Sequence, residues 1–224
     1  MRVVSLVPSI TETLLAWGVR PVAVTRFCEQ PGFPTVGGTK DPDLDAIVAL
    51  VPDLVVVNDE ENRRPDFDAL VAAGLTVHVT RVHTVADVAP MLAELAAAVE
   101  RPVPEVVVLR SARPIGRRAF VPIWRRPWMT SNADTYGMSV LRVLGVAGVF
   151  DAAAERYPTV TLEDAAAARP DLVLLPSEPY PFAERHVDEL RAVAPDVRLV
   201  DGRDLFWWGT RTAPALARLA QVLA

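Results

Sequence analysis

The first third of the chain alternates between short apolar runs and segments whose apolar residues have helical spacing. Four runs fit buried parallel strands, at residues 3–7, 22–25, 54–57 and 75–80. Three segments between them fit helices, at residues 9–18, 43–50 and 66–73. Ser9 followed by Glu12 has the pattern of a capping box, which predicts that Ser9 caps the first helix. Because strands and helices alternate, we expect a parallel sheet with right-handed crossovers.

Part of this pattern recurs after a spacing of 118 residues. Residues 44–60 read LDAIVALVPDLVVVNDE, and residues 162–178 read LEDAAAARPDLVLLPSE. Each stretch combines a helix-like segment, a Pro-Asp break, an apolar strand and an acidic turn. The repeat predicts two similar α/β lobes, and clefts between lobes are common sites for small ligands.

The rest of the chain completes this two-lobe arrangement. Residues 85–99 predict a helix rich in alanine and leucine, and residues 105–115 fit either a strand or a short helix. The second lobe is predicted to contain strands at residues 119–123 and 197–200 and helices at residues 136–144, 183–193 and from 213 onwards. These elements divide the chain into an amino-terminal lobe at residues 1–84, a linker region at 85–118 and a carboxy-terminal lobe at 119–224.

Composition restricts the classes of partner. Apolar residues make up 51% and charged residues 23% of the chain, which is typical of globular domains. The net charge of −5 and the pI near 5.3 disfavour nucleic acid as a partner. Because no apolar run reaches the ~20 residues that span a bilayer, no membrane insertion is predicted. The single cysteine, Cys28, excludes an intramolecular disulfide.

The amino-terminal residues 1–18 read MRVVSLVPSITETLLAWG. Pro8 and Glu12 interrupt the apolar region and no small-residue cleavage site follows, so we interpret it as a strand and a helix rather than a secretion signal. This interpretation predicts a cytoplasmic location for the chain as written, and an extracytoplasmic location if an export signal has been removed.

Ligands of open parallel sheets bind at the carboxyl ends of the strands. Many aromatic residues follow predicted strands or lie in loops, namely Trp124, Trp128, Tyr136, Tyr157, Tyr180, Phe182, Phe206, Trp207 and Trp208. Such rings can stack on a flat, partly apolar ligand and still offer an N–H or O–H group. Any single ring fits the filling of a core gap equally well, whereas the group as a whole favours a ligand-lining role.

Signals for catalysis are weaker. Cys28 could act as a nucleophile, and His83, which follows a predicted strand, could act as its base. We expect His186 to lie exposed in a polar helix. The chain contains no GxSxG, HExxH, CxxC or GxxxxGK[ST] motif and no metal-ligand spacing. An enzyme that uses Cys28 and His83 is therefore the alternative to a binding protein.

The repeat makes Glu60 and Glu178 equivalent, and each follows a strand on a turn that we expect to be exposed. Two such carboxylates, one in each lobe, can dock on basic residues of a partner with two-fold symmetry. Acidic residues are also common in turns that have no function. A homodimer that uses these turns is a third hypothesis.

Several segments together resemble one known family. They read RVVSLVPSITETLLAWG, FCEQP, VGGTKDPDLDAIVALVPDLVVVNDEENR, PIWRRPWM, RYPTVTLEDAAAARPDLVLLPSEPYPF and WWGTRT. The chain resembles the helical-backbone (class III) solute-binding proteins of ABC importers, especially the cobalamin type and members without a secretion signal. The resemblance implies an α/β fold of two Rossmann-like lobes with parallel sheets, which hold a metal chelate such as cobalamin, haem or a ferric siderophore.

The resemblance also implies roles for individual residues. The residues that would line the ligand cleft are Ser9, Cys28, Trp124, Trp128, Tyr136, Trp208 and Arg211. Arg211 or Lys40 would pair with anionic groups of the ligand, and His83 is the histidine that we expect to reach it. In exported members one glutamate of each lobe meets arginines of the permease, which carries over to Glu60, with Glu61 as a close rival, and to Glu178.

The chain departs from the family pattern in its linker. The family joins its lobes by one long helix, whereas Pro102, Pro104 and Pro114 interrupt residues 101–118, which predicts a short or broken helix. The absence of a recognisable signal makes a role inside the cell an alternative to transport. We therefore expect a non-catalytic binding protein that has no intrinsic cofactor or metal and holds a metal chelate as its ligand.

Overall fold

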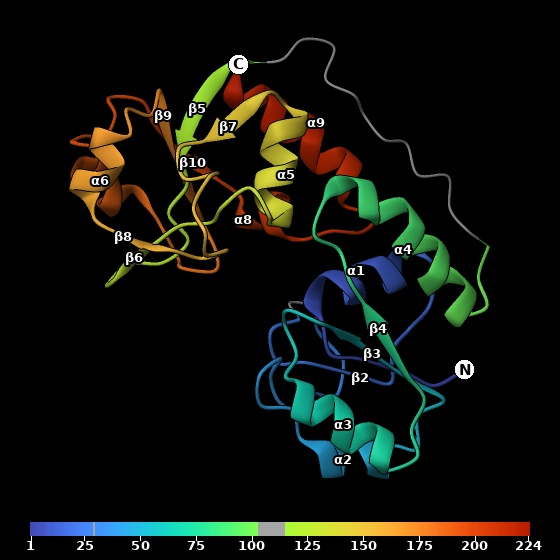
Figure 1. The fold of residues 1–224 in the computed structure, drawn as a ribbon. Helices are drawn as coiled ribbons and strands as arrows, with labels where there is room; N and C mark the ends of the chain where they lie inside the picture. The colour runs from blue at the N-terminus through green and yellow to red at the C-terminus, as the bar shows by residue number, and fades with distance from the viewer. Residues whose placement is uncertain (29, 103–114) are drawn as a thin grey trace. The chain divides into compact units, whose positions relative to one another are not determined.

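The computed structural model describes residues 1–28, 30–102 and 115–224, which form two compact units (Figure 1). Unit 1 comprises Met1–Val82, Ala86–Val106 and Trp208–Thr210. Unit 2 comprises His83–Val85, Val107–Trp207 and Arg211–Ala224. Each unit therefore includes one short segment whose neighbours along the chain belong to the other unit.

Unit 1 is built on a parallel sheet of four strands in the order β2–β1–β3–β4. The strands are β1 (Val3–Ser5), β2 (Ala23–Val24), β3 (Leu54–Asn58) and β4 (Val77–Thr80). Every residue of β1, β2 and β3 is buried. Such continuous burial is expected of valine-rich parallel strands that are covered on both faces.

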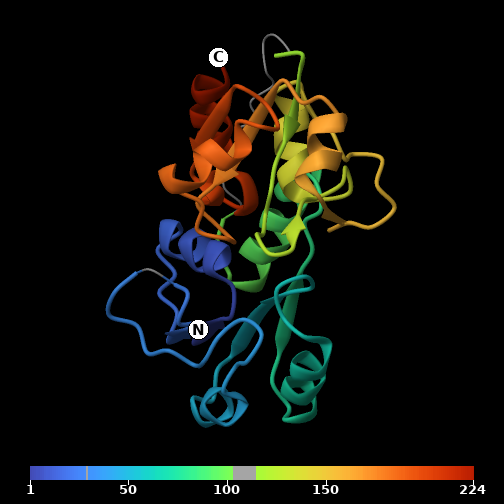
Figure 2. The same cartoon turned by 90° about the vertical axis from the view of Figure 1, so that its left-hand side faces the viewer.

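Four helices cover the two faces of this sheet, namely α1 (Pro8–Ala16), α2 (Leu44–Ala49), α3 (Arg64–Ala72) and α4 (Val85–Ala98). Figure 1 shows α2 and α3 on one side of the sheet and α1 and α4 on the other. Val55 and Val57 join the core with α2 and α3, so Leu54 and Val56 face the opposite side. Figure 2 shows the connection from β2 to α2 as a long loop beside the sheet.

Unit 2 has the same architecture. Its parallel sheet has the order β10–β9–β5–β7, with β5 (Arg117–Phe120), β7 (Val146–Gly148), β9 (Leu172–Pro176) and β10 (Val197–Val200). Read backwards, this order matches β2–β1–β3–β4 strand for strand. Its helices are α5 (Tyr136–Val143), α6 (Leu162–Ala167), η1 (Glu184–His186), α7 (Val187–Leu190), α8 (Gly202–Phe206) and α9 (Thr212–Leu223).

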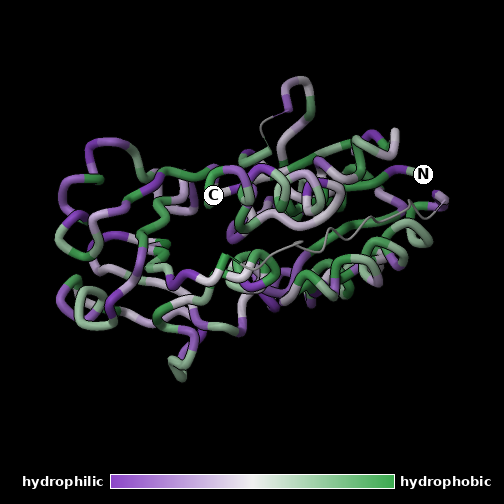
Figure 3. The backbone as a smooth tube through the Cα atoms, turned by 90° about the horizontal axis from the view of Figure 1, so that it is seen from above, coloured by the Kyte–Doolittle hydropathy of each residue, from purple (hydrophilic) through white to green (hydrophobic). Residues whose placement is uncertain are grey.

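The faces of the second sheet are covered in the same way. Figure 1 shows α6 on one side and α5 and α9 on the other. Phe120, Val173, Leu175 and Leu190 form the core on the α6 side. An antiparallel pair, β6 (Trp128–Met129) and β8 (Thr159–Val160), is an addition that unit 1 lacks among its described residues. Hydrophilic residues, purple in Figure 3, lie mainly in the connections and on the outer faces of the helices.

The duplication extends to individual hydrogen bonds. The backbone N–H of Arg2 donates to the Asp53 carboxylate at 2.6 Å, and the backbone N–H of Arg118 donates to the Asp171 carboxylate at 2.6 Å. In return, the N–H groups of Asp53 and Asp171 donate to the carbonyls of Arg2 and Arg118, each at 2.8 Å. Equivalent aspartates therefore join the two central strands of each sheet, β1 to β3 in unit 1 and β5 to β9 in unit 2.

The ends of α2 and α6 are also equivalent. The side chains of the same two arginines donate to the carbonyls of Leu50 at 2.7 Å and of Ala168 at 3.0 Å, which lie at the two helix C-termini. Val51 and Arg169, which follow these caps, both have positive φ values, 45° and 50°. Because helix carbonyls at a C-terminus lack intrahelical donors, the arginines satisfy groups that would otherwise need water.

The predicted fold class, α/β with two parallel sheets, is confirmed. The predicted cap is wrong, since Val7 is the N-cap of α1 and Pro8 takes the first helical position, where its fixed φ suits a helix start. The sequence pattern does not reveal β7 or α8, because elements of three and five residues are too short to show a period. Residues 105–114 of the segment predicted as strand or short helix lie outside the described residues, as do Pro104 and Pro114.

Candidate ligand-binding site

The carboxyl end of β1 leads into α1, which carries Ser9, and the carboxyl end of β2 leads into the loop that carries Cys28. The sulfur of Cys28 lies 3.2 Å from Thr11 Oγ1 and 3.5 Å from Thr25 Oγ1. Threonine hydroxyls do not accept a proton at neutral pH, so these contacts supply no base that would activate the thiol. Cys28 belongs to unit 1 and His83 to unit 2, and a pairing of the two stays a prediction.

Ser9 lies in the first turn of α1 and is only 4% exposed. Its hydroxyl has no hydrogen-bond partner among the residues that the structure describes. The Ser9 carbonyl accepts a hydrogen bond from Thr13 Oγ1 at 3.1 Å. Thr13 Oγ1 in turn accepts from the backbone N–H of Thr210 at 3.3 Å. The segment Trp208–Thr210 of unit 1 is thereby fastened to α1, and Trp208 is buried with 4% of its surface exposed.

A network of amide side chains fixes the acidic turn after β3. Asn58 Oδ1 accepts from the backbone N–H groups of Glu60 at 2.9 Å and Glu61 at 3.1 Å, and Asn62 Oδ1 accepts from Asn58 N at 2.8 Å. Lys40, predicted as a ligand residue, donates through Nζ to the Glu60 carbonyl at 2.6 Å. Glu60 and Glu61 are half-buried rather than exposed, because this network draws the turn onto the sheet edge.

The acidic turn after β9 in unit 2 is fixed differently. Ser177 Oγ accepts from the backbone N–H of Gly202 at 3.0 Å, and Ser177 N donates to the Val200 carbonyl at 3.0 Å. A Cβ atom at position 202 would lie 2.6 Å from the backbone N and O of Glu178, so only glycine fits there. Glu178 is half-buried, which corrects the expectation of an exposed turn here too.

Five side chains of unit 2 form an aromatic cluster, which comprises Trp124, Trp128, Tyr180, Phe182 and His186. Trp124 meets Tyr180 edge-on at 5.5 Å between ring centroids, and Trp128 stacks on Phe182 at 5.9 Å with an interplanar angle of 1°. Tyr180 and Phe182 are 4.6 Å apart. These residues come together because β5 and β9 are neighbours, so the loops that follow them leave the same sheet edge.

The members of the aromatic cluster differ in their exposure to solvent. Trp124 is 44% exposed, whereas Phe182 is 4% and His186 5% exposed. The expectation that His186 is exposed to solvent is therefore wrong, because the short helix turns its imidazole towards the rings. The guanidinium of Arg125 lies 5.7 Å from the centroid of the Trp128 ring and pairs with Glu189 at 2.9 Å. The ion pair fixes this cation against the tryptophan ring.

Tyr136 at the start of α5 is buried within unit 2. Its hydroxyl lies 2.9 Å from the hydroxyl of Thr212 at the start of α9. Burial raises the pKa of Tyr136 to about 12, so the phenol stays protonated at physiological pH. These contacts join two helices, and a role in lining a ligand stays a prediction.

Arg211 belongs to a charged group around Asp204. Its Nη1 lies 2.9 Å from Asp204 Oδ1, and its guanidinium lies 5.7 Å over the Trp207 ring. Arg218 Nε donates to the same carboxylate at 2.7 Å. Burial would raise the pKa of Asp204, but hydrogen bonds from Arg218 and Arg211 outweigh it and hold the pKa below its usual value. Two guanidinium groups therefore bind one buried carboxylate, which fixes the Arg211 side chain beside Asp204.

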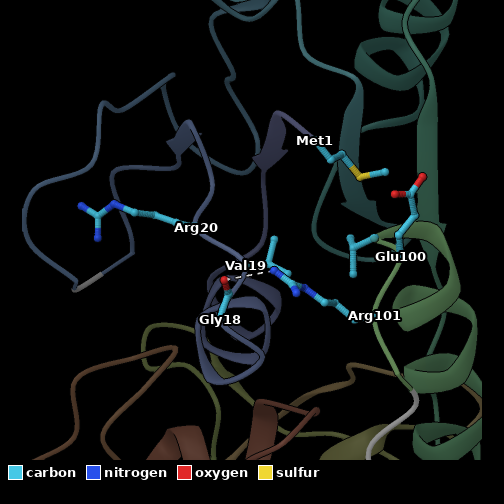
Figure 4. A pocket seen from close by; sticks show the side chains of 7 residues that line it. Met1, Gly18, Val19, Arg20, Glu100 and Arg101 are labelled. Atoms are coloured by element: carbon cyan, nitrogen blue, oxygen red, sulfur yellow. Dashed lines mark hydrogen bonds between the residues drawn. The ribbon is translucent and has the colours of Figure 1, made fainter.

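A hollow of about 300 Å³ lies elsewhere on unit 1. It is lined by Met1, Gly18, Val19, Arg20, Val99, Glu100 and Arg101 (Figure 4). Figure 4 shows the Arg20 side chain pointing away from the other lining residues. The hollow lies next to the start of β1 and the ends of α1 and α4, so it is at the amino edge of the unit 1 sheet, away from the carboxyl ends of its strands.

Two absences apply to the described parts of the chain. They contain no group of three or more histidine, cysteine or acidic side chains arranged to hold a metal ion. No helix in them combines the length and the apolar character that crossing a bilayer requires.

Comparisons with known proteins give relatives over most of the chain, although no family model matches it. The vitamin B12-binding protein of Salmonella typhimurium is 27% identical over 190 residues, which cover 78% of this chain and 71% of the relative. The vitamin B12-binding protein of Yersinia pestis (strain Pestoides F) is 25% identical over 246 aligned positions, which cover 99% of this chain and 84% of the relative.

Solved structures share the whole fold. The periplasmic vitamin B12 binding protein of Vibrio cholerae matches with a TM-score of 0.81 and 22% identity, over 99% of this chain and 96% of the other. The periplasmic heme-binding protein of Roseiflexus sp. RS-1 matches with a TM-score of 0.80 and 18% identity, over 99% and 97%. In sequence and fold this chain is similar to the class III periplasmic binding proteins.

These comparisons confirm the resemblance to binding proteins of the class III type that was read from the sequence. Sequence reasoning nevertheless missed several residues that shape the candidate site. Asn58, Asn62 and Gly202 fix the acidic turns, and His186 supports the aromatic cluster. Asparagines just after a strand end and a glycine after Asp201 were the available signals, since both mark turns.

Proposed function

We propose that this protein binds a metal chelate with a large flat ring system, of the corrinoid, haem or siderophore-like kind, without transforming it. The aromatic cluster of unit 2 supplies part of the binding surface, and Trp124 is its contact with the ligand. The observation that carries this proposal is a 44% exposed tryptophan held edge-on by a second aromatic ring at the carboxyl edge of a parallel sheet.

The physical basis is burial of apolar area against a preorganised ring. Trp124 is already restrained by Tyr180, so a ligand that covers it loses little further side-chain entropy on binding. Apolar contact contributes roughly 25 cal/mol per Å² of surface removed from water. Relatives named for binding vitamin B12 or heme support a ligand of this size and shape.

Anionic groups of the ligand would be met by Arg211, which the buried Asp204 carboxylate holds in place, and by Lys40. Further lining positions in the proposal are Ser9, Cys28, His83, Trp128, Tyr136 and Trp208. The contacts of Cys28 with two threonines favour this binding role over a thiol nucleophile.

Ligand titration tests the proposal. Purified protein is mixed with cyanocobalamin, hemin and a ferric siderophore, and tryptophan quenching gives each Kd. Trp124→Ala is expected to weaken the best ligand at least about tenfold, since an anchoring ring contributes upwards of 1.4 kcal/mol. Val222→Ala on α9, also an exposed apolar side chain, is the control that leaves Kd unchanged. Absence of binding by all three compounds at tens of micromolar would end the proposal.

We also propose that Glu60 and Glu178 contact arginines of an ABC permease. Both carboxylates lie on turns that hydrogen bonds or close backbone contacts hold in place, which suits rigid docking. Glu60→Gln and Glu178→Gln are expected to leave ligand affinity unchanged and to weaken stimulation of permease ATP hydrolysis. Asp45→Asn and Glu163→Gln, which remove repeat-related charges on α2 and α6, are the matched controls. Equal stimulation by all four variants would exclude the docking role.

A further inference from the structure

His186 lies inside the aromatic cluster. It is 5% exposed, and its ring centroid is 5.7 Å from that of Tyr180 and 5.5 Å from that of Phe182. Those two rings are the ones that contact Trp124 and Trp128. The imidazole is therefore a buried support for both tryptophans, one contact removed from the exposed surface.

The protonation state of this imidazole follows from one hydrogen bond. The backbone N–H of Ala183 donates to His186 Nδ1 at 3.1 Å. A backbone amide can only donate here, so Nδ1 must offer a lone pair and the ring proton must sit on Nε2. The bond closes the turn η1, which connects the loop carrying Tyr180 and Phe182 to α7. The arrangement therefore requires a neutral imidazole.

We propose that His186 is a positioning residue that holds the aromatic cluster in its binding geometry only while neutral, so that mild acid weakens ligand binding at Trp124. This inference rests on the proposed function for its ligand, but not for its effect on the cluster. Protonation would turn Nδ1 into a donor facing the Ala183 donor, and the hydrogen bond that closes η1 would be lost. The rings of Tyr180 and Phe182 would then lose their fixed support.

The charges around His186 favour the neutral form. Burial is the main cause that lowers the pKa of His186, and the cations of Arg185 on η1 and Arg125 in the loop after β5 lower it further. Glu189 on α7 acts in the opposite direction but does not compensate. Because Glu189 already pairs with Arg125, it is a weak counter-ion for an imidazolium.

The direction of the pH effect follows from this lowered pKa. In the unfolded chain the imidazole has its ordinary pKa of 6.5, and in the folded protein the pKa is lower. The support is therefore fully present above about pH 6.5 and is lost as the pH falls through the folded pKa. The phenol ring of Tyr180 also faces the imidazole, with 5.7 Å between the ring centroids.

The test compares three proteins between pH 8 and pH 5. Cyanocobalamin and hemin serve as probes, and Kd is measured by tryptophan quenching for the wild type, His186→Asn and His78→Asn. Asparagine keeps an acceptor oxygen for the Ala183 N–H but cannot titrate. His78 is half-buried in β4 of unit 1, and burial likewise lowers its pKa, so it controls for a histidine outside the cluster.

Wild type and His78→Asn are expected to lose about tenfold in affinity per pH unit below the folded pKa, while His186→Asn stays constant. Near-UV circular dichroism of the ligand-free proteins, which reports the order of the tryptophans, should titrate in the same two proteins only. The ¹⁵N shifts of the His186 ring in the wild type give its tautomer and pKa without any substitution.

The outcomes separate this inference from the proposed function. If no chelate binds at pH 8 but the dichroism titrates through His186, the positioning role holds and the ligand proposal fails. A ligand that binds with the same pH dependence in His186→Asn as in the wild type overturns the inference. A ¹⁵N spectrum that shows Nδ1 protonated at pH 8 overturns it as well, even if His186→Asn does not fold.

Discussion

Units 1 and 2 share a scaffold but differ at the carboxyl edge of their sheets. The hydrogen bond from the backbone N–H of Arg2 to the Asp53 carboxylate in unit 1 is repeated between Arg118 and Asp171 in unit 2. At the carboxyl edge, by contrast, unit 1 has a network of asparagine amides and unit 2 has the aromatic cluster. The two units have the same hydrogen bonds between strands and different side chains at the carboxyl edge of the sheet.

This difference separates two kinds of constraint. A strand-joining aspartate serves the sheet whatever the protein binds, so both copies keep it. An edge residue serves only its own loop, so the two copies are free to diverge. Loops on a rigid scaffold are where binding residues concentrate in proteins generally. Three pairs of substitutions test how far this separation holds, beginning with the largest expected effect.

Gly202→Ala should be the most damaging change at the unit 2 edge. The new methyl group would lie 2.6 Å from backbone atoms of Glu178, and backbone cannot move away cheaply. We expect a loss of about 2–3 kcal/mol in the free energy of unfolding, measured by urea denaturation. Gly74→Ala in unit 1 has nothing within 4 Å and a φ of 81°, so it should cost only about 1 kcal/mol for the left-handed backbone. Equal losses would show that crowding is not what distinguishes position 202.

Asn62→Ala tests the amide network of unit 1. Asn62 is 8% exposed, accepts from Asn58 N and donates to the carbonyls of Leu6 and Thr39. Removing its amide leaves buried polar groups unpaired, so we expect a loss of about 2 kcal/mol in thermal or urea unfolding. Ser177→Ala, at the exposed equivalent edge of unit 2, should cost less because water can replace the hydroxyl. A larger loss for Ser177→Ala would contradict the greater role of polar bonds in unit 1.

Asp53→Ala and Asp171→Ala test the shared scaffold. Each removes an acceptor 2.6 Å from the backbone N–H of an arginine at a sheet edge open to solvent. Both should lower the free energy of unfolding by about 1 kcal/mol, and by similar amounts. Hydrogen exchange of the Arg2 and Arg118 amides would locate the effect in each unit. Strongly unequal losses would break the equivalence that the repeat implies.

The repeat and the long apolar runs made most of the fold predictable. The stretch PDLVVVN and its copy PDLVLLP show breaker, strand and burial within a few residues, so β3 and β9 were readable without any neighbour. Strand β7 could not be predicted, since three residues are too few to show an alternation of apolar and polar positions. The strand forms only through its pairing with β5, which is distant in sequence. The start of α1 was misplaced because Ser9 has a capping side chain but Pro8 precedes it.

The candidate site was less predictable than the fold. Loop aromatics pointed to Trp124, Trp128, Tyr180 and Phe182, but nothing along the chain shows that these four meet one another. The sequence around His186 reads ERHVDEL, whose polar character predicts exposure to solvent. Its burial arises from the rings it packs against, which lie in other segments.

Local patterns in the chain were enough to predict two α/β halves, most strands of their parallel sheets and a resemblance to one family, because periodicity and repetition act over short separations. Which loops share an edge, which histidine turns inward and which tryptophan remains open depended on the folded arrangement. The physical reason is that strand order brings together residues far apart in sequence, and only that proximity sets their burial, their hydrogen bonds and the protonation of His186.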